Sequence, residues 1–399
     1  MSLPLTKEAA GLDEKKDKIW TRDFTLICFS NFFVFLAFQM TLPTIPLFVE
    51  ALGGNDQLIG FVVGIFTFSA LLMRPYAGHA LDSKGRGFVY ILGLCIFVIS
   101  VGSFGLLPSL FLLFAMRIVQ GIGWGFSTTA SGTIATDLIP PKRRGEGMGY
   151  FGLFGNVALA VGPTLGLTLA GLISFTQLFL ICASLGVVSL LLSSQIRFRK
   201  GEKKVSTEPK KKWDVYEKSA LPPAILLFFI TVTFGGIATF LPLYTAQKGV
   251  EGIQWYFFLF AIALMLSRTF AGRIYDRKGH RAVFPYGTLA IFIAMLLLAW
   301  LPNSYILFLA AVLYGLGFGS VQPALQAWAV QTAAVNRRGM ANATFFSSFD
   351  LGVGIGAMAF GQIAYWFSYS TIYMAAAMSV SISLILYFAV LGKSSVQEV

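Results

Sequence analysis

The sequence has 399 residues, of which 56% are hydrophobic and only 12% are charged, and its mean hydropathy is +0.74. Soluble domains carry about 25% charged residues, so this composition excludes a soluble enzyme, a disordered chain and a disulfide-stapled secreted scaffold. The formal net charge of +12 would suit a nucleic-acid partner or a membrane surface, and the positions of the charges distinguish the two.

Twelve stretches of the chain are long and apolar enough to cross a membrane, which takes about 20 residues of helix. They lie at 24–50, 57–81, 88–107, 110–136, 145–171, 174–196, 221–247, 253–276, 283–301, 304–333, 339–366 and 369–391. Runs such as 110–116 are apolar on every face, unlike the alternating strands of a membrane barrel. We therefore predict an all-α membrane protein with twelve transmembrane helices.

The basic residues gather on one side of this predicted topology. Of the 30 Lys and Arg residues, 26 lie in the two tails and in the loops that follow every second span, whereas the opposite loops hold only Lys248. The positive-inside rule then predicts a multi-pass protein of the cell membrane with both termini in the cytoplasm. The basic excess marks topology and attracts anionic membrane lipid, so we expect no nucleic-acid partner.

Other classes of function lack the residues that they need. Cys28, Cys95 and Cys182 fall within apolar spans as packing residues, and the two histidines are 201 positions apart, so we expect no metal site and no cofactor. The chain has no G-x4-G-K-[ST] sequence, which excludes an ATP-driven pump. We expect no enzymatic activity, and we expect a monomer.

The two halves of the chain repeat each other at an offset of 194 residues. The stretch from Arg74 to Gly85 recurs from Arg268 to Gly279, and the same offset carries Asn156 onto Asp350. Parallel repeats of this kind place a substrate site near the membrane midplane, between two halves that rock to expose it alternately. The predicted organisation is an N-terminal tail, a six-helix bundle, a charged linker, a second six-helix bundle and a C-terminal tail, at 1–23, 24–196, 197–219, 220–391 and 392–399.

Three motifs give the sequence a family resemblance. The loop after the second span resembles the G-x-L-x-D-x-x-G-R-[KR] signature of the major facilitator superfamily, and the fourth span carries R-x-x-Q-G-x-G in full. The fifth span carries part of the G-x-x-x-G-P-x-x-G-G motif of drug-exporting members, with Ala158 and Leu167 in place of the outer glycines. The matching residues are Gly78, Asp82, Lys84, Gly85 and Arg86; Arg117, Gln120, Gly121 and Gly123; and Gly162, Pro163 and Gly166. The resemblance implies two pseudo-symmetric six-helix bundles and favours the proton-coupled exporter branch, of the Gram-positive bacterial type.

The loop motif implies a gate in this family. By resemblance, Asp82 would latch onto the start of the eleventh helix, where a carboxylate meets a positive helix N-terminus. The repeat supplies a second set of gating residues in Gly272, Asp276, Lys278 and Gly279. We expect Arg74 and Arg268 to support these latches. The alternative is a basic turn that only sets topology.

A deep acid is the candidate for proton coupling. Asp350 lies eleven residues into the eleventh predicted span, about 16 Å deep at 1.5 Å per residue. An ionisable group at that depth costs at least about 2.5 kcal/mol and suggests function. Our hypothesis makes Asp350 the proton-coupling acid and Arg117 its modulating partner, and the alternative is a static ion pair.

Polar and aromatic residues of several spans could line a substrate cavity between the halves. The candidates are Asn31, Phe35, Gln39, Gln120, Trp124, Asn156, Tyr244, Gln322, Gln326 and Phe346. Such a wall suits an amphipathic or aromatic molecule better than a sugar, which would need more hydrogen-bonding groups.

The leading prediction is a secondary active exporter that exchanges protons for amphipathic or aromatic small molecules by alternating access. Three alternatives stay open: a dedicated exporter of one metabolite, metallophore or lipid-linked molecule; a proton-coupled uptake porter of the same fold; and a non-transporting sensor or scaffold. The motifs of the fourth and fifth spans argue against uptake, and the repeat with its deep charges argues against a scaffold.

Overall fold

The computed structural model describes residues 18–106, 109–140, 143–198, 216–334 and 337–394. The side chains of Asp82, Gly145, Asp276 and residues 390–394 lie outside this description.

Twelve long helices in these ranges are apolar enough to cross a bilayer, which confirms the predicted number. The first six are α2 (Arg22–Ala51), α3 (Asp56–Ser83), α4 (Arg86–Ser103), α5 (Leu110–Leu138), α6 (Arg144–Ala170) and α7 (Phe175–Ser194). The second six are α8 (Leu221–Lys248), α9 (Ile253–Lys278), α10 (His280–Trp300), α11 (Ser304–Gln331), α12 (Arg338–Trp366) and α13 (Tyr369–Ser394).

Twelve alternating helices bring the start of α2 and the end of α13 to one end of the molecule, called here the termini end; the opposite end is the far end. Several helices that start at the far end are capped by short polar side chains, although α9 is not. Asn55, Ser109 and Asn303 each accept a hydrogen bond from a backbone N–H of the first turn. At the termini end, Gly85 and Gly279 make the turns before α4 and α10 with positive φ angles of 94° and 68°, which glycine adopts without strain.

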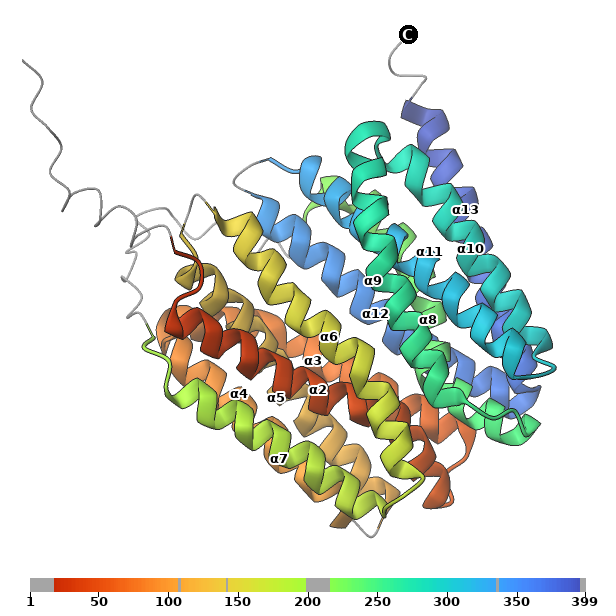
Figure 1. Cartoon of the computed structure of the whole chain (residues 1–399), viewed down its shortest axis with the longest axis horizontal. Helices are drawn as coiled ribbons and strands as arrows, with labels where there is room; N and C mark the ends of the chain where they lie inside the picture. The colour runs from red at the N-terminus through yellow and green to blue at the C-terminus, as the bar shows by residue number, and fades with distance from the viewer. Residues whose placement is uncertain (1–17, 107–108, 141–142, 199–215, 335–336, 395–399) are drawn as a thin grey trace, which may run out of the picture.

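The helices form two bundles, α2–α7 and α8–α13 (Figure 1). Within the first bundle, α2 packs on α6 and α7, and α5 packs on α3 and α4. The second bundle repeats this plan, with α8 on α12 and α13 and α11 on α9 and α10. The chain is therefore an all-α membrane protein of two pseudo-symmetric six-helix bundles. The exact domain boundaries stay a prediction, and most of the predicted linker lies outside the described residues.

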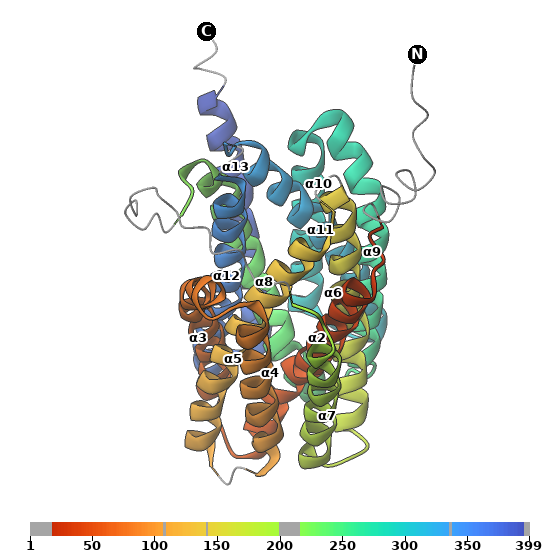
Figure 2. The ribbon, with the colours of Figure 1, turned by 90° about the vertical axis from the view of Figure 1, so that its left-hand side faces the viewer.

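Two helix pairs make most of the contacts between the bundles, and we call them the α3–α12 seam and the α6–α9 seam; α2 and α8 also touch. Figure 2 shows the first pair on the left and the second on the right. Both seams are closed toward the far end. The Gln57 side-chain amide donates to Gln362 Oε1 at 2.7 Å in the α3–α12 seam, and Thr164 Oγ1 donates to the Gln254 carbonyl at 3.0 Å in the α6–α9 seam.

Toward the termini end, both seams open. Gly78 of α3, Gly152 of α6 and Gly272 of α9 have no atom within 4 Å of the position that a Cβ would take. Gly78 follows Arg74 by four residues, about one helical turn, on the same face of α3. The bundles are thus closed against each other at one end and separated at the other, as alternating access requires of one of its states.

Candidate substrate and coupling site

The centre of the α3–α12 seam holds an ion pair between the bundles. Arg74 Nη2 of α3 lies 2.7 Å from Asp350 Oδ2 of α12. Arg74 lies nine residues and Asp350 twelve residues from the termini end of its helix, which places both about 14–18 Å deep. Their side chains are 29% and 23% exposed, so the pair can be reached by small molecules and by protons.

The predicted partnership of Asp350 with Arg117 is wrong in this structure. Arg117 lies 21 residues from the termini end of α5, about 32 Å along the helix and some 14 Å beyond the depth of Asp350. It is 1% exposed within the N-terminal bundle. Its Nε donates to the Val62 carbonyl at 3.0 Å, its Nη1 donates to Gln120 Oε1, and it lies over the Phe66 ring at 4.5 Å.

The predicted role of Arg74 and Arg268 as supports of the loop latches is also corrected. Arg74 reaches across the seam to Asp350, whereas Arg268 Nη2 donates to Gln322 Oε1 at 2.7 Å within the C-terminal bundle. In both arginines, Nε is buried and has no hydrogen-bond partner among the described residues. The repeat was the sequence signal that could have pointed to the contact between Arg74 and Asp350. One offset relates Arg74 to Arg268 and Asn156 to Asp350, which marks both positions as equivalent sites of the two halves.

An aromatic stack stands beside the seams in the N-terminal bundle. Trp124 of α5 stacks on Phe38 of α2 with ring centroids 4.1 Å apart, and it contacts Phe35 at 4.8 Å. The C-terminal bundle repeats the stack with Phe234 and Phe318 at 5.8 Å. Trp124, Phe234 and Phe318 are buried, whereas Phe35 and Phe38 are partly exposed. Phe35 and Trp124 were among the predicted cavity residues.

The predicted polar residues divide into bonded and unbonded groups. Asn31 accepts a hydrogen bond from Ser131, and Gln326 donates to Asn342 at 2.9 Å. Gln39 Oε1 and Gln120 Nε2 are buried without a partner. Asn156 and Phe346 are partly exposed on α6 and α12.

Tyr244 is misplaced in the predicted cavity. It lies four residues from the far end of α8 and is 1% exposed. Its ring stacks on Tyr373 at 5.5 Å, and its hydroxyl donates to the Ala299 carbonyl. These contacts lie inside the C-terminal bundle, so Tyr244 packs helices together in this conformation.

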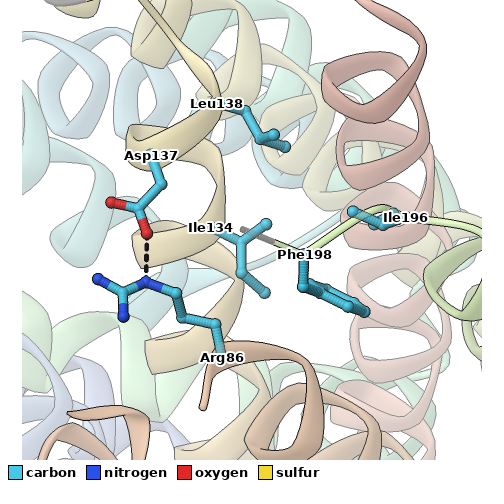
Figure 3. Close-up of a pocket in the computed structure, with 6 residues that line it drawn as sticks. All are labelled: Arg86, Ile134, Asp137, Leu138, Ile196 and Phe198. Carbon is cyan, nitrogen blue, oxygen red and sulfur yellow. Dashed lines mark hydrogen bonds and ion pairs between the residues drawn. The ribbon is translucent and has the colours of Figure 1, made fainter. Parts of the chain in front are cut away.

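The loop motif forms an ion pair within the N-terminal bundle. Arg86, at the start of α4, bonds Asp137 near the end of α5. Figure 3 shows the pair in a small pocket beside Ile134 and Phe198. Lys84, Gly85, Lys278 and Gly279 form the turns at the termini end. The predicted latches of Asp82 and Asp276 concern side chains outside the described part of the structure.

The motif of the fifth span packs helices closely. A Cβ at Gly162 would meet Gln39, and one at Gly166 would meet the backbone of Met40. Both glycines, with Pro163 between them, therefore let α6 approach α2. Within the described residues, no group of three or more His, Cys, Asp or Glu side chains could hold a metal ion.

Comparisons with known proteins agree with this architecture. The staphylopine export protein of Staphylococcus aureus is 23% identical over 86% of this chain and 90% of its own length. The multi-drug resistance efflux pump PmrA of Streptococcus pneumoniae is 26% identical over 91% and 94%. A variant of the nucleoside transporter NupG has a TM-score of 0.77 over 92% of this chain and 99% of its own. At 15% identity, that likeness shows the fold alone.

The family model of the Major Facilitator Superfamily matches residues 27–254 and 224–398. These ranges cover nearly the whole chain and both six-helix bundles. The chain therefore belongs to the Major Facilitator Superfamily and is a multi-pass membrane transporter of small molecules.

Proposed function

We propose that this transporter exports amphipathic or aromatic small molecules from the cytoplasm in exchange for protons. The observation that carries the proposal is the ion pair between Arg74 and Asp350, which joins the two bundles at mid-membrane depth and stays partly exposed. Among described residues, Asp350 is the carboxylate that lies deepest from both ends of its helix. In this family the moving parts are the two bundles, so a titratable bond between them links protonation to movement.

The chemistry of the pair supports coupling. An ionised carboxylate at this depth is held by its charge-assisted hydrogen bond to Arg74. When Asp350 takes a proton, the attraction is lost and Arg74 must find other acceptors, which weakens the α3–α12 seam. When Asp350 releases the proton, the pair forms again. Proton binding therefore loosens the α3–α12 seam and lets the two bundles move relative to each other, and proton release restores the bond between them.

The direction of transport follows from the orientation that the basic loops predict. If the termini lie in the cytoplasm of the cell, the separated ends of the bundles face the cytoplasm and can take up cargo there. Two relatives carry names that describe export, a staphylopine exporter and a multidrug efflux pump. The aromatic stacks around Trp124 and Phe318 suit cargo with a flat apolar part.

The test is proton exchange in energised inverted membrane vesicles that contain the protein. A panel of aromatic amines, neutral aromatics and aromatic carboxylates is added while the pH gradient is recorded. We expect transported members to dissipate the gradient, and we expect Asp350→Asn to lower this response at least tenfold because an amide does not titrate in this range.

The matched control is Glu146→Gln, the same acid-to-amide change in an exposed pair with Arg143 at the start of α6. It should keep the response. A normal response from Asp350→Asn would refute the role of this acid. A response to a single member of the panel would favour the dedicated exporter over the broad one.

A further inference from the structure

The internal repeat relates the residues of one seam to those of the other. A position at which the two seams differ in residue type therefore points to a difference in function. The offset of 194 carries Gly60 onto Gln254 and Met358 onto Thr164. Gly60 and Gly64 pack against the stretch of α12 around Met358, and Gln254 bonds Thr164 in the other seam. Equivalent residues therefore make equivalent contacts near the far end of both seams.

The offset of 194 residues also relates Arg74 to Arg268 and Asn156 to Asp350. Arg268 lies ten residues from the termini end of α9, and Asn156 lies twelve from that of α6, so both are about 15–18 Å deep. The α3–α12 seam thus pairs an arginine with an acid. In the α6–α9 seam the repeat puts the amide Asn156 at the position equivalent to that acid. The second arginine lacks the carboxylate that the first one has.

The charges at this depth do not balance. Among described residues, four Asp, Glu, His, Lys or Arg side chains lie seven or more residues from both ends of their helices, namely Arg74, Arg117, Arg268 and Asp350. Three are cations and one is an anion. Arg117 is held by a carbonyl, an amide oxygen and the face of an aromatic ring. Arg268 has a single neutral acceptor, Gln322 Oε1, and its Nε is buried without one.

A partly exposed guanidinium with a buried Nε and so few acceptors calls for an anionic ligand, because Arg presents five N–H donors that match a carboxylate. Asn156 stands where the acid would be and offers an amide donor to the same group. Its side chain makes no hydrogen bond to any described residue, and α6 is open one turn away at Gly152. Phe318 lies one turn before Gln322 on α11, which adds an apolar surface beside the arginine.

We propose that Arg268 and Asn156 bind an anionic group of the cargo, so that the transported molecule is an organic anion whose carboxylate replaces the acid missing from the α6–α9 seam. Gln322 holds Arg268 while the site is empty. The proposal rests on the transport function above, and it adds the charge of the cargo and the residues that recognise it.

Equilibrium binding to the purified full-length protein in detergent tests this site without a proton gradient. The probes are benzoate, indole-3-acetate and 2-naphthoate, each paired with its primary amide, and the readout is the shift in melting temperature with ligand concentration. We expect at least one acid to bind, with at least tenfold higher affinity than its amide. Arg268→Gln should abolish this preference, and Arg268→Lys should retain part of it.

Two further variants keep the test decisive. Asn156→Asp supplies the missing acid, so it should fold normally, match or exceed the melting temperature of the unsubstituted protein, and lose binding of the acid at least tenfold. Arg273→Gln removes an exposed arginine five residues further along α9 and should leave the preference unchanged. Equal affinity for acids and amides, a preference that survives Arg268→Gln, or no binding by any acid would overturn the proposal. Failure of proton coupling in Asp350→Asn would leave these binding results intact.

Discussion

At the scale of single residues, burial separates the roles of the deep arginines. Arg117 is 1% exposed and is bonded to groups of its own bundle, so it cannot exchange partners without opening the N-terminal bundle. Arg74 is 29% exposed and its partner belongs to the other bundle. An arginine that switches partners must be of the second kind, since the surrounding helices stay packed when it moves.

The sequence predicted Asp350 as a deep acid but assigned it the wrong partner. Hydropathy and helix rise locate a residue along the membrane normal, and that was enough to single out Asp350. They do not say which neighbouring helix a side chain faces. That direction depends on the packing of α3 against α12, which local sequence patterns do not encode, although the repeat offset contains part of it.

The contact between Glu217 and Arg337 should depend on pH. The hydrogen bond from Arg337 holds the pKa of Glu217 below its ordinary value of 4.5. A lowered pKa in the folded state means that the stabilisation is fully present above the ordinary value and is lost as the pH falls through the lowered one. Glu217→Gln should therefore lower the melting temperature by ~1–2 °C near pH 7.

The difference between Glu217→Gln and the unsubstituted protein should shrink as the pH falls below the ordinary value of 4.5 and through the lowered pKa of Glu217. Melting curves recorded between pH 3 and 7 measure it, and Glu146→Gln serves as a control for an exposed acid. A difference that is constant with pH would show that the contact acts by packing and not by charge.

At the scale of helices, the far end of the α3–α12 seam depends on close backbone contact. A Cβ at Gly60 would collide with the Ala357 carbonyl and with Cα of Gly361, which are backbone atoms that cannot turn aside. A Cβ at Gly64 would meet only the flexible side chain of Met358. The two glycines lie one turn apart on α3, so Gly64→Ala is a matched control for Gly60→Ala.

Gly60→Ala should weaken the closed far end by about 1–3 kcal/mol through overpacking, and Gly64→Ala should have a much smaller effect. The measurement is the labelling rate of a single cysteine at Thr67, which is 8% exposed in the seam, after Cys28, Cys95 and Cys182 are replaced by Ala. We expect a membrane-impermeant thiol reagent to label Thr67→Cys faster in the Gly60→Ala background. Equal rates in both glycine variants would mean that the seam does not open at this point.

At the scale of the whole molecule, the fold was more predictable than the site. Twelve spans, their pairing into two bundles and the repeat all follow from hydropathy and from one constant offset, because a helix in lipid must satisfy its own backbone hydrogen bonds. The seams depend on how the bundles dock, and the stack of Trp124 on Phe38 and the position of Tyr244 depend on how helices dock within each bundle. Docking involves contacts between helices far apart in the sequence, and single-span patterns carry no information about them.

Alternating access predicts that a bond across the closed seam stops transport. The Cβ of Thr67 and an added Cβ at Gly354 would be 3.0 Å apart, so a small outward shift of either helix would bring them to the roughly 3.5–4.5 Å that a disulfide spans. In the cysteine-free background, oxidation of Thr67→Cys/Gly354→Cys should lower transport at least tenfold, and a reducing agent should restore it. Each single cysteine variant should be insensitive to oxidation. Full transport by the cross-linked protein would rule out movement at this seam.

The unmatched charge of Arg268 has an electrical consequence. Because the acid that Arg74 has is missing at Arg268, a monocarboxylate crosses the membrane as a negative charge that neutralises the guanidinium only while it is bound. A cell interior that is negative by 100 mV expels such a charge with about 2.3 kcal/mol, and a proton that returns in exchange moves inward along the same field. Voltage and pH then act in the same direction on one cycle, so an exporter built on this seam would concentrate its cargo outside even where the pH difference across the membrane is small.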